Sequence, residues 1–393
     1  MLLVVGILLI AMNLRAPITG VGPLLDAIRA SLHLSSTQAG LLTTLPLLAF
    51  AVVSPFAARL AKAFGLERSL FAALCLLAVG IAVRSVGSVW GLYLGTCVIG
   101  GGIAIANVLL PSLLKRDFPD KITLFTAVYA LTMGVTAALG SVGAIPLATV
   151  SGLGWQFAMG VLVLLPVIAA LAWFPQLRRR DAAASGVSTV AQGESLWRSP
   201  LAWQVTLFLG LNSFVYYVAT AWLPSILADA GYSPSEAGNL HGLLQLATAV
   251  PGVVLVPLVK RMKDQRAVAF GMSLLATLGL VGLMEAPAWA TLWTVLFGFG
   301  AGAALILGLA FVSLRATHSQ QAAALSGMAQ CFGYLLAAVG PTLIGVIHDA
   351  RGDWRAALGL CAALCFLTAV LGLFAGRAIH IDGKAPALAG SRG

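Results

Sequence analysis

Ser35 to Arg68 reads SSTQAGLLTTLPLLAFAVVSPFAARLAKAFGLER, and Ser233 to Arg266 reads SPSEAGNLHGLLQLATAVPGVVLVPLVKRMKDQR. The two stretches align without a gap at a constant shift of 198 positions, and twelve aligned residues are identical. Gly40 matches Gly238 in this alignment. An internal repeat of this length indicates that the chain is built from two similar halves.

The composition indicates a membrane protein. Apolar residues make up 60% of the 393 residues and charged residues only 9%, and the mean hydropathy is +0.98. Soluble domains carry about a quarter charged residues. Stretches long enough to cross a bilayer core of about 30 Å follow one another at residues 2–26, 37–58, 69–87, 89–113, 122–147, 154–175, 201–226, 236–259, 267–284, 289–314, 321–346 and 354–376.

These stretches predict helices rather than strands. They are apolar on all sides, whereas the strands of a membrane β-barrel alternate over segments of about ten residues. Helices are the remaining structure that spans a bilayer. We therefore predict an all-α membrane protein with 12 transmembrane helices. The first stretch has no basic region before it and has a counterpart in the second half, so we expect a retained helix rather than a cleaved signal peptide.

The net charge of +10 is distributed unevenly between the two sides of the membrane. Eighteen Lys and Arg residues fall in one set of alternate loops, and the other set holds Arg29, Arg84, Arg351 and Arg355. Basic loops stay in the cytoplasm. We therefore expect both termini and the loop between the halves to be cytoplasmic, and we predict no nucleic-acid partner.

The repeat extends beyond its best-matching block and divides the chain. Trp90 corresponds to Trp289, and Lys115 corresponds to Arg315, at shifts of 199 and 200. We predict a six-helix bundle over 1–176, a cytoplasmic linker over 177–200, a second six-helix bundle over 201–377 and a cytoplasmic tail over 378–393. Two halves in the same orientation are an architecture of membrane transporters.

Other classes of function find little support in the residues. The glycine runs at 100–102 and 298–302 follow no strand, so they do not match a dinucleotide-binding fingerprint. The five cysteines lie in apolar spans without a metal-binding spacing. A nucleophile with a neighbouring base is not visible. We predict that the protein is not an enzyme and has no cofactor or metal, while a channel or receptor remains an alternative.

The loop after the second span resembles the signature of the major facilitator superfamily. That signature reads Gly-x-Leu-Ala-Asp-Arg-x-Gly-Arg-Lys, and residues 58–68 of this chain fit it at Leu60, Ala61, Gly65 and Arg68. Lys62 stands at the acidic position, which argues against the superfamily's carboxylate contact on the cytoplasmic face. The resemblance implies the major facilitator fold, a single functional chain and gating loops that include Lys62, Gly65, Arg68, Lys260 and Arg266.

Longer strings resemble the cyanate and nitroimidazole transporter family (CynX/NimT), and most of all its 2-nitroimidazole-exporter branch. They are LRAPITGVGPLLDAIR at 14–29, GLLTTLPLLAFAVVSP at 40–55, WRSPLAWQVTLFLGLNS at 197–213, HGLLQLATAVPG at 241–252 and AALSGMAQ at 323–330. This resemblance implies a secondary transporter of a small polar or anionic molecule in a bacterial inner membrane, with membrane lipids around it and protons as the coupling ion.

Arg15 is the strongest candidate for substrate contact. A charged residue inside a membrane span costs about 2.5–3.5 kcal/mol on insertion scales and usually faces a watery cavity. No Asp or Glu lies deep in any span, so an anionic or electron-rich ligand would suit the guanidinium. A structural role, satisfied by helix carbonyls or by snorkelling, is the alternative.

Other polar residues at similar depth complete the predicted site. His241 is the histidine inside a span and the candidate for proton coupling, although a neutral or packing role competes. Pro17 and Pro111 are expected to loosen their helices locally. For the remaining candidates, packing or hydrogen bonding between helices is the alternative; they are Asn13, Asn212, Tyr216, Tyr217, Gln245, Gln330 and Tyr334.

The sequence therefore predicts a secondary transporter that works by alternating access. Efflux of 2-nitroimidazole-like compounds coupled to the proton gradient is the leading activity that the family resemblance implies. Uptake of cyanate or another small anion, by symport, exchange or uniport, is the alternative.

Overall fold

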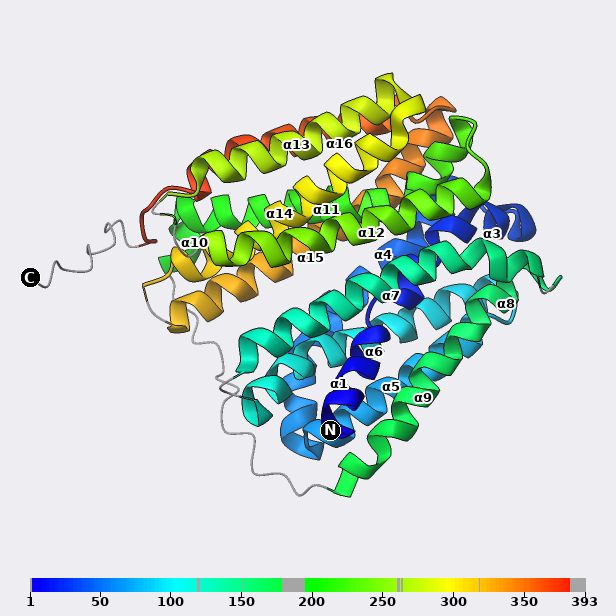
Figure 1. The fold of residues 1–393 in the computed structure, drawn as a ribbon, viewed down its shortest axis with the longest axis horizontal. Coiled ribbons are helices and arrows are strands. Elements are labelled where there is room, and N and C mark those ends of the chain that lie inside the picture. Colours follow the sequence, from blue (N-terminus) through cyan, green and yellow to red (C-terminus); the bar gives the residue numbers. More distant parts are fainter. Residues whose placement is uncertain are drawn as a thin grey trace, which may run out of the picture.

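We describe a computed structural model of the chain over residues 2–118, 121–150, 152–178, 195–259, 262, 264–317 and 319–381 (Figure 1). Within these ranges the chain forms helices and no strand. Eleven of the helical segments are long and apolar enough to cross a membrane. The all-helical prediction is confirmed. The predicted span over 236–259 coincides with α12 (Pro234–Val259), and the count of twelve spans stays a prediction.

The described residues of the first half form nine α-helices. The first span is divided into short pieces, and the sixth span contains a short 3-10 turn, η3 (Val161–Val163). The α-helices are α1 (Leu2–Met12), α2 (Ala16–Thr19), α3 (Leu25–Leu32), α4 (Ser36–Phe64), α5 (Leu66–Arg84), α6 (Val89–Asp117), α7 (Ile122–Val150), α8 (Gly154–Gly160) and α9 (Leu164–Trp173).

The second half has longer, less interrupted helices. After α10 (Ser195–Arg198) come α11 (Pro200–Asp229), α12, α13 (Arg266–Glu285), α14 (Ala290–Leu314), α15 (Ser319–Arg351) and α16 (Arg355–Ala375). Residues 179–194 of the predicted linker and 382–393 of the predicted tail lie outside the described residues.

The first span breaks where the sequence contains a proline. Residues 13–15 form a turn between α1 and α2, and Pro17 lies in the first turn of α2. Proline has no N–H to donate to the preceding turn, so a continuous helix would lose a hydrogen bond here. The local loosening expected at Pro17 is present, whereas α6 runs through Pro111 as one helix.

The two halves meet at one end and diverge at the other (Figure 1). We call the end where α4 stops and α5 starts the basic end, since Lys62, Arg68 and Arg116 lie there. The opposite end, which includes the turn between α3 and α4 and the last turn of α15, we call the closed end. Across the boundary between halves, α4 packs on α15 and α7 packs on α12.

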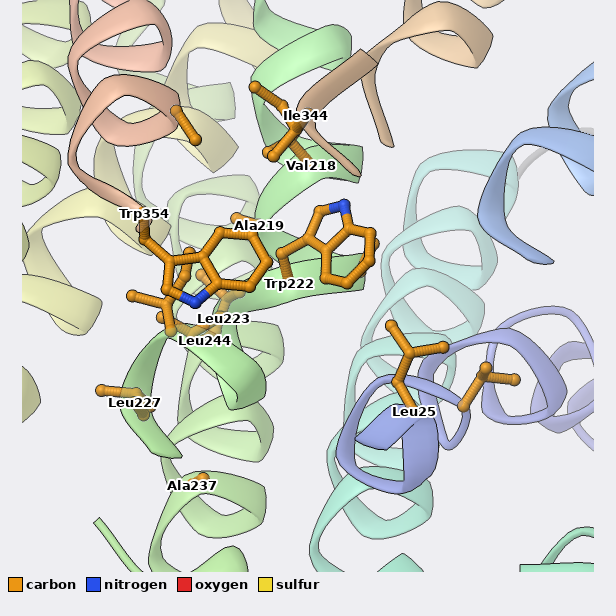
Figure 2. Close-up of a cluster of buried hydrophobic side chains, with 14 of the residues drawn as sticks. Leu25, Val218, Ala219, Trp222, Leu223, Leu227, Ala237, Leu244, Ile344 and Trp354 are labelled. Carbon is orange, nitrogen blue, oxygen red and sulfur yellow. The ribbon is translucent and has the colours of Figure 1, made fainter. Parts of the chain in front are cut away.

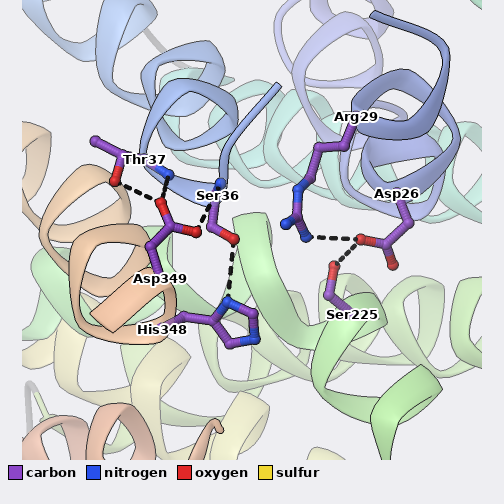
Figure 3. Close-up of polar contacts among 7 residues, drawn as sticks. All are labelled: Asp26, Arg29, Ser36, Thr37, Ser225, His348 and Asp349. Carbon is purple, nitrogen blue, oxygen red and sulfur yellow. Dashed lines mark hydrogen bonds and ion pairs between the residues drawn. The ribbon is translucent and has the colours of Figure 1, made fainter. Parts of the chain in front are cut away.

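Hydrogen bonds join the halves at the closed end (Figure 3). The backbone N–H groups of Ser36 and Thr37 donate to the Asp349 carboxylate at 3.0 and 2.8 Å. These groups begin α4 and have no partner inside the helix, and a carboxylate there also complements the helix dipole. His348 Nδ1 lies 3.0 Å from Ser36 Oγ. The first turn of α4 is thus held by the last turn of α15.

A second contact at the closed end involves α3. The Ser225 hydroxyl donates to the Asp26 carboxylate at 2.9 Å, and Arg29 lies 3.4 Å from the same oxygen (Figure 3). The Asp26 and Arg29 side chains are partly exposed, so this ion pair contributes little stability by itself.

An apolar cluster fills the closed end and includes residues of both halves (Figure 2). Trp222 and Trp354 pack with ring centroids 5.1 Å apart, and the Trp222 indole N–H donates to the Pro341 carbonyl at 2.9 Å. Leu25 from the first half belongs to the same cluster. Burial of this apolar surface stabilises the contact between the halves.

Candidate substrate-binding site

A cavity of about 650 Å³ lies between the two halves. Its lining residues lie in the middle of the molecule or closer to the basic end. Examples are Ser54 of α4, Asn107 of α6, Tyr129 of α7, Leu309 of α14 and Gln330 of α15. The closed end contributes none of these walls. The structure therefore presents the cavity toward the basic end.

Arg15 lies in this cavity at the break of the first span. Its Nη1 donates to the Tyr216 hydroxyl at 3.1 Å, and its guanidinium carbon lies 5.5 Å from the centroid of the Tyr216 ring. Among the described residues no carboxylate forms an ion pair with it. A guanidinium has five N–H donors. Donors therefore remain available for a ligand that enters the cavity.

Tyrosine rings form the wall next to Arg15. Tyr216 and Tyr217 of α11 pack edge to face with centroids 5.3 Å apart, and both line the cavity. Tyr334 of α15 also lines it and packs edge to face on Phe50 at 5.7 Å. Aromatic walls with a few fixed polar groups are typical of sites for flat small molecules.

A chain of polar groups runs from Arg15 into the contact between α7 and α12. The Tyr216 hydroxyl donates to Gln245 Oε1 at 2.7 Å. Gln245 lies one turn from His241, with Nε2 of each 3.5 Å apart, and His241 Nδ1 lies 3.0 Å from Ser141 Oγ. Both His241 and Gln245 are fully buried. The cavity is therefore connected to the interface between the halves through neighbouring polar side chains.

His241 also contacts the first span. A side-chain carbon at Gly22 would lie 2.7 Å from the Thr220 carbonyl oxygen and 3.3 Å from His241 Cε1. Only a residue without a side chain fits this approach of η1 (Gly22–Leu24) to α11 and α12. The imidazole is consequently enclosed by both halves.

Five of the predicted substrate residues line the cavity, and three do not. Gln245 lies outside the cavity lining and accepts a hydrogen bond from the Tyr216 hydroxyl. Asn13 and Asn212 are buried, and their amide groups donate to the carbonyls of Leu9 and Ala301 at 2.8 and 3.1 Å. Asn212 thus makes a hydrogen bond between helices, which was the alternative for it, whereas Asn13 bonds to a carbonyl of its own span. The cavity is lined by Arg15, Tyr216, Tyr217, Gln330 and Tyr334.

Several lining residues were not singled out from the sequence. Phe50, Ser54, Ser213 and Thr220 line the cavity, and Asn107 and Met133 do so as well. Ser213 and Tyr217 are four residues apart on α11, as are Phe50 and Ser54 on α4, so each pair shares a helix face. Once one residue of a helix is known to line the cavity, this four-residue spacing identifies others on the same face.

The matching family model covers residues 3–338 and describes the major facilitator superfamily. The chain belongs to the major facilitator superfamily. It is 56% identical over 375 residues to the 2-nitroimidazole transporter of Escherichia coli (strain K12), with 95% of each chain covered. It is also 29% identical to the cyanate transport protein CynX of the same organism, over 88% of this chain and 90% of that one. The resemblance to the cyanate and nitroimidazole transporters is confirmed.

Solved structures show the same fold. A crystal structure of a bacterial homologue of the human lysosomal transporter Spinster, in an inward-facing and unoccupied conformation, superposes with a TM-score of 0.77. It covers 98% of both chains at 15% identity. The protein is a multi-pass membrane transporter of this superfamily rather than an enzyme.

The loop with the superfamily signature has a different ion pair in this transporter. Lys62 and Arg68 are exposed at the basic end, and Gly65 between α4 and α5 has φ of 90°, a conformation that favours glycine. The charged contact is instead made by Arg116, which donates to Glu67 and to Asp117. Arg266 pairs with Asp264, and Lys260 lies outside the described residues.

The described part of the chain was compared with the ligand clusters that metal ions require. No group of three or more His, Cys, Asp or Glu side chains lies together there. Cys361 and Cys365 are both buried in the packed core of the closed-end cluster, as free thiols.

Proposed function

We propose that this transporter exports small nitro-aromatic or anionic solutes, with 2-nitroimidazole-like compounds as the leading substrates. The observation that carries the proposal is the position of Arg15, which lines the cavity with donors free and no carboxylate partner among the described residues. A guanidinium fork matches the two oxygens of a nitro group or a carboxylate. Tyr216 and Tyr217 beside it offer ring faces to a flat heterocycle.

The relatives support this substrate class. The transporter that shares 56% of its residues over nearly the whole chain is named for 2-nitroimidazole. The cyanate transport protein is more distant at 29%. Uptake of cyanate or another small anion is the alternative, because the same guanidinium also suits a compact anion.

The cavity gives a solute access to Arg15 from the basic end, in a state that export and uptake share. It extends from Arg15 toward the basic end, and basic loops mark the cytoplasmic side. A solute would therefore enter from the cytoplasm in this conformation. Alternating access then requires the contacts at the closed end to open and the basic end to close. The proposal includes cytoplasmic termini, an inner-membrane location, a single functional chain and bundles over 1–176 and 201–377.

Arg15→Ala and Arg15→Lys test the solute contact. The wild type and both variants are reconstituted in proteoliposomes with 2-nitroimidazole, cyanate and benzoate as separate solutes. A hydrogen bond to a charged group contributes about 1.5–3 kcal/mol, so we expect kcat/KM to fall at least about tenfold in Arg15→Ala. Arg15→Lys keeps the charge and loses the fork, so an intermediate loss is expected.

Arg355→Ala is the matched control, because Arg355 pairs with Glu285 on the exposed surface of the closed end. We expect its transport to match the wild type. If both Arg15 variants retained full transport of every solute, the proposed site would be rejected. Transport of cyanate and not of 2-nitroimidazole would instead support the alternative substrate class.

We further propose that His241 couples transport to the proton gradient. The imidazole lies between Ser141 of the first half and Gln245 of the second, where the halves must separate during transport. Its charge state would change the stability of that contact. Gln at this position keeps hydrogen bonding but does not titrate.

The test compares two modes of transport in His241→Gln. Solute exchange without any gradient should persist, while accumulation driven by a pH gradient should be lost. Thr43→Ser, at the corresponding position of the first half, is the control and should keep both modes. Proton-driven accumulation in His241→Gln would remove His241 from the coupling role.

A further inference from the structure

Helix α6 presents one face to the substrate cavity, and that face carries a single side-chain amide. Ala104, Asn107, Val108 and Pro111 line the cavity and follow the i, i+3, i+4, i+7 spacing of one helix face. Asn107 is partly exposed, so its side chain is accessible from the cavity. Its amide makes no hydrogen bond to another described residue. Gln330, the other amide in the lining, donates to a hydroxyl of its own helix at 3.0 Å.

Pro111 leaves a second acceptor at the same position. A helical residue normally donates its backbone N–H to the carbonyl four residues earlier, and for position 111 that carbonyl belongs to Asn107. Proline has no N–H, so the Asn107 carbonyl lacks its usual partner although α6 runs through Pro111 as one helix. Asn107 therefore offers the cavity one donor group and two acceptor groups.

The second half has no polar side chain at the equivalent position. A glycine of α6 approaches α4 as a glycine of α14 approaches α12, and at the shift of 198 the matching residues are Gly100 with Gly298, Pro46 with Leu244 and Ala49 with Ala247. At the same shift Asn107 corresponds to Leu305 and Pro111 to Leu309, and both leucines line the cavity. Leu309 also has the N–H that Pro111 lacks. At this depth the cavity is thus polar on its α6 wall and apolar on its α14 wall.

The position of Asn107 along the cavity suits a solute that also reaches Arg15. Gly298 is level with Gln245, which accepts from the tyrosine that binds Arg15. Leu305, and with it Asn107, lies seven residues closer to the basic end, about 10 Å along the helix. A single ring with a nitro group and a hydrogen bond at each end spans a distance of this order. The two side chains can therefore contact opposite ends of one small solute.

We propose that Asn107 recognises a ring N–H of the transported solute and thereby selects azoles over simple anions. This inference rests on the proposed function, in which Arg15 binds the nitro or carboxylate end. The two acceptors of Asn107 suit a ring N–H, and its NH₂ group suits an acceptor on the same solute. A site that hydrogen bonds a substrate N–H discriminates against an analogue without it, because the polar groups of the site are then left unpaired.

Two solutes that differ at this N–H test the inference. The wild type and the variants are reconstituted in proteoliposomes. Exchange of 2-nitroimidazole and of 1-methyl-2-nitroimidazole is measured in mildly acidic buffer, where the first solute keeps its N–H, and the readout is the ratio of the two kcat/KM values. In Asn107→Leu, which installs the residue of the second half, we expect this ratio to fall at least about fivefold, as for loss of one neutral hydrogen bond.

Three further variants make the test specific. Pro111→Ala leaves the amide in place and restores an N–H donor to the Asn107 carbonyl, so the ratio should fall by a smaller factor. Arg15→Ala should lower both kcat/KM values and keep their ratio, because both solutes carry the nitro group. Ser112→Ala is the control on α6, since its hydroxyl donates to the Val108 carbonyl and it lies outside the cavity lining. Its ratio should match that of the wild type.

The outcomes separate this inference from the proposed function. A lowered ratio in Asn107→Leu, with the wild-type ratio in Ser112→Ala, supports the role of Asn107. An unchanged ratio in both Asn107→Leu and Pro111→Ala would overturn that role, even if Arg15→Ala lost transport of both azoles as the proposed function requires. If the wild type transported benzoate or cyanate and neither azole, the leading substrate class and the role of Asn107 would both be rejected.

Discussion

Helix α4 and helix α12 carry the two copies of the repeat, and each packs against the opposite half of the transporter. On α4, the Thr44 hydroxyl donates to the Ala338 carbonyl at 2.6 Å and lies 2.9 Å from the Thr342 hydroxyl. On α12, the contact with α7 is made by buried His241 and the neighbouring Gln245.

The difference lies at the positions where the repeat is mismatched. Thr43 and Leu47 of α4 correspond to His241 and Gln245 of α12. Leu47 is buried in an apolar cluster, whereas Gln245 holds the tyrosine that bonds Arg15. The residues that the two repeats share determine how the helices pack. The residues that differ, His241 and Gln245, make the contact between α12 and α7 polar.

The largest effect is expected from Gly40→Ala, compared with Gly238→Ala at the identical position of the repeat. A side-chain carbon at Gly40 would lie 2.7 Å from the Pro341 carbonyl oxygen and 2.8 Å from Thr342 Cα. Over-packing of this kind costs about 1–3 kcal/mol, so the closed end should open more often. At Gly238 the nearest atoms are 3.5 Å or farther, and Ala should fit.

Labelling of Ser36→Cys by a membrane-impermeant thiol reagent, in a background without the native cysteines, measures this opening. Gly40→Ala should label about 5- to 140-fold faster, the factors that correspond to about 1 and 3 kcal/mol, and Gly238→Ala should label at the parental rate. Equal labelling of the two variants would mean that the contacts of α4 and α12 respond alike, contrary to the structure.

Gln245→Leu, which installs the residue found in the first half, should have the next largest effect. It removes the acceptor of the hydrogen bond that the Tyr216 hydroxyl donates. Loss of one partner of a buried hydrogen bond costs about 1–3 kcal/mol, so kcat/KM in proteoliposomes should fall about tenfold. Leu47→Met, a volume-conserving change on α4, is the control. Unchanged transport in Gln245→Leu would show that Tyr216 is held by other contacts.

A smaller effect is expected from Asp349→Asn. Both helices have an internal capping box, Ser35 with Gln38 on α4 and Ser233 with Glu236 on α12, and α4 is capped in addition by Asp349 of the opposite half. Loss of a charged cap costs about 0.5–2 kcal/mol. In the same labelling assay Asp349→Asn should open the closed end by a few fold, and Glu236→Gln should not. Faster labelling in Glu236→Gln than in Asp349→Asn would contradict the conclusion that the capping contact between the halves is made at α4.

The smallest effect concerns the turn before α13. Hydrogen bonds from the Arg266 guanidinium hold the pKa of Asp264 below its ordinary value. The carboxylate therefore adds stability at neutral pH that is lost as the pH falls through its lowered pKa. Because this pair is exposed, its contribution to stability should be small.

Melting temperatures of the wild type and Asp264→Asn, measured from pH 7 down to pH 3, should differ most at neutral pH and converge in acid. The first half has Leu66 at the position of Asp264, so Leu66→Met provides a variant without such a titration. A difference that grew as the pH fell would contradict the sign of the effect.

The repeat, the helical spans and the position of Arg15 in a cavity follow from sequence because hydropathy and an isolated intramembrane charge are local signals. The hydrogen-bond partner of a buried amide can lie far away in the sequence, so local signals do not reveal it. Asn212 hydrogen bonds to a carbonyl of α14, and only the packing of helices far apart in sequence determines this. Arg84 was likewise counted with the loop charges, whereas the structure buries it beneath Pro17.

The polar chain from Arg15 to Ser141 has a thermodynamic consequence for the transport cycle. If solute binding at Arg15 changes the equilibrium between open and closed halves, then a change in that equilibrium must alter solute affinity by the same factor. Substitutions at Gly40 or Asp349, far from the cavity, are therefore expected to alter the apparent Kd measured from the basic side. A solute that bound equally well in both arrangements would leave the equilibrium between them unchanged.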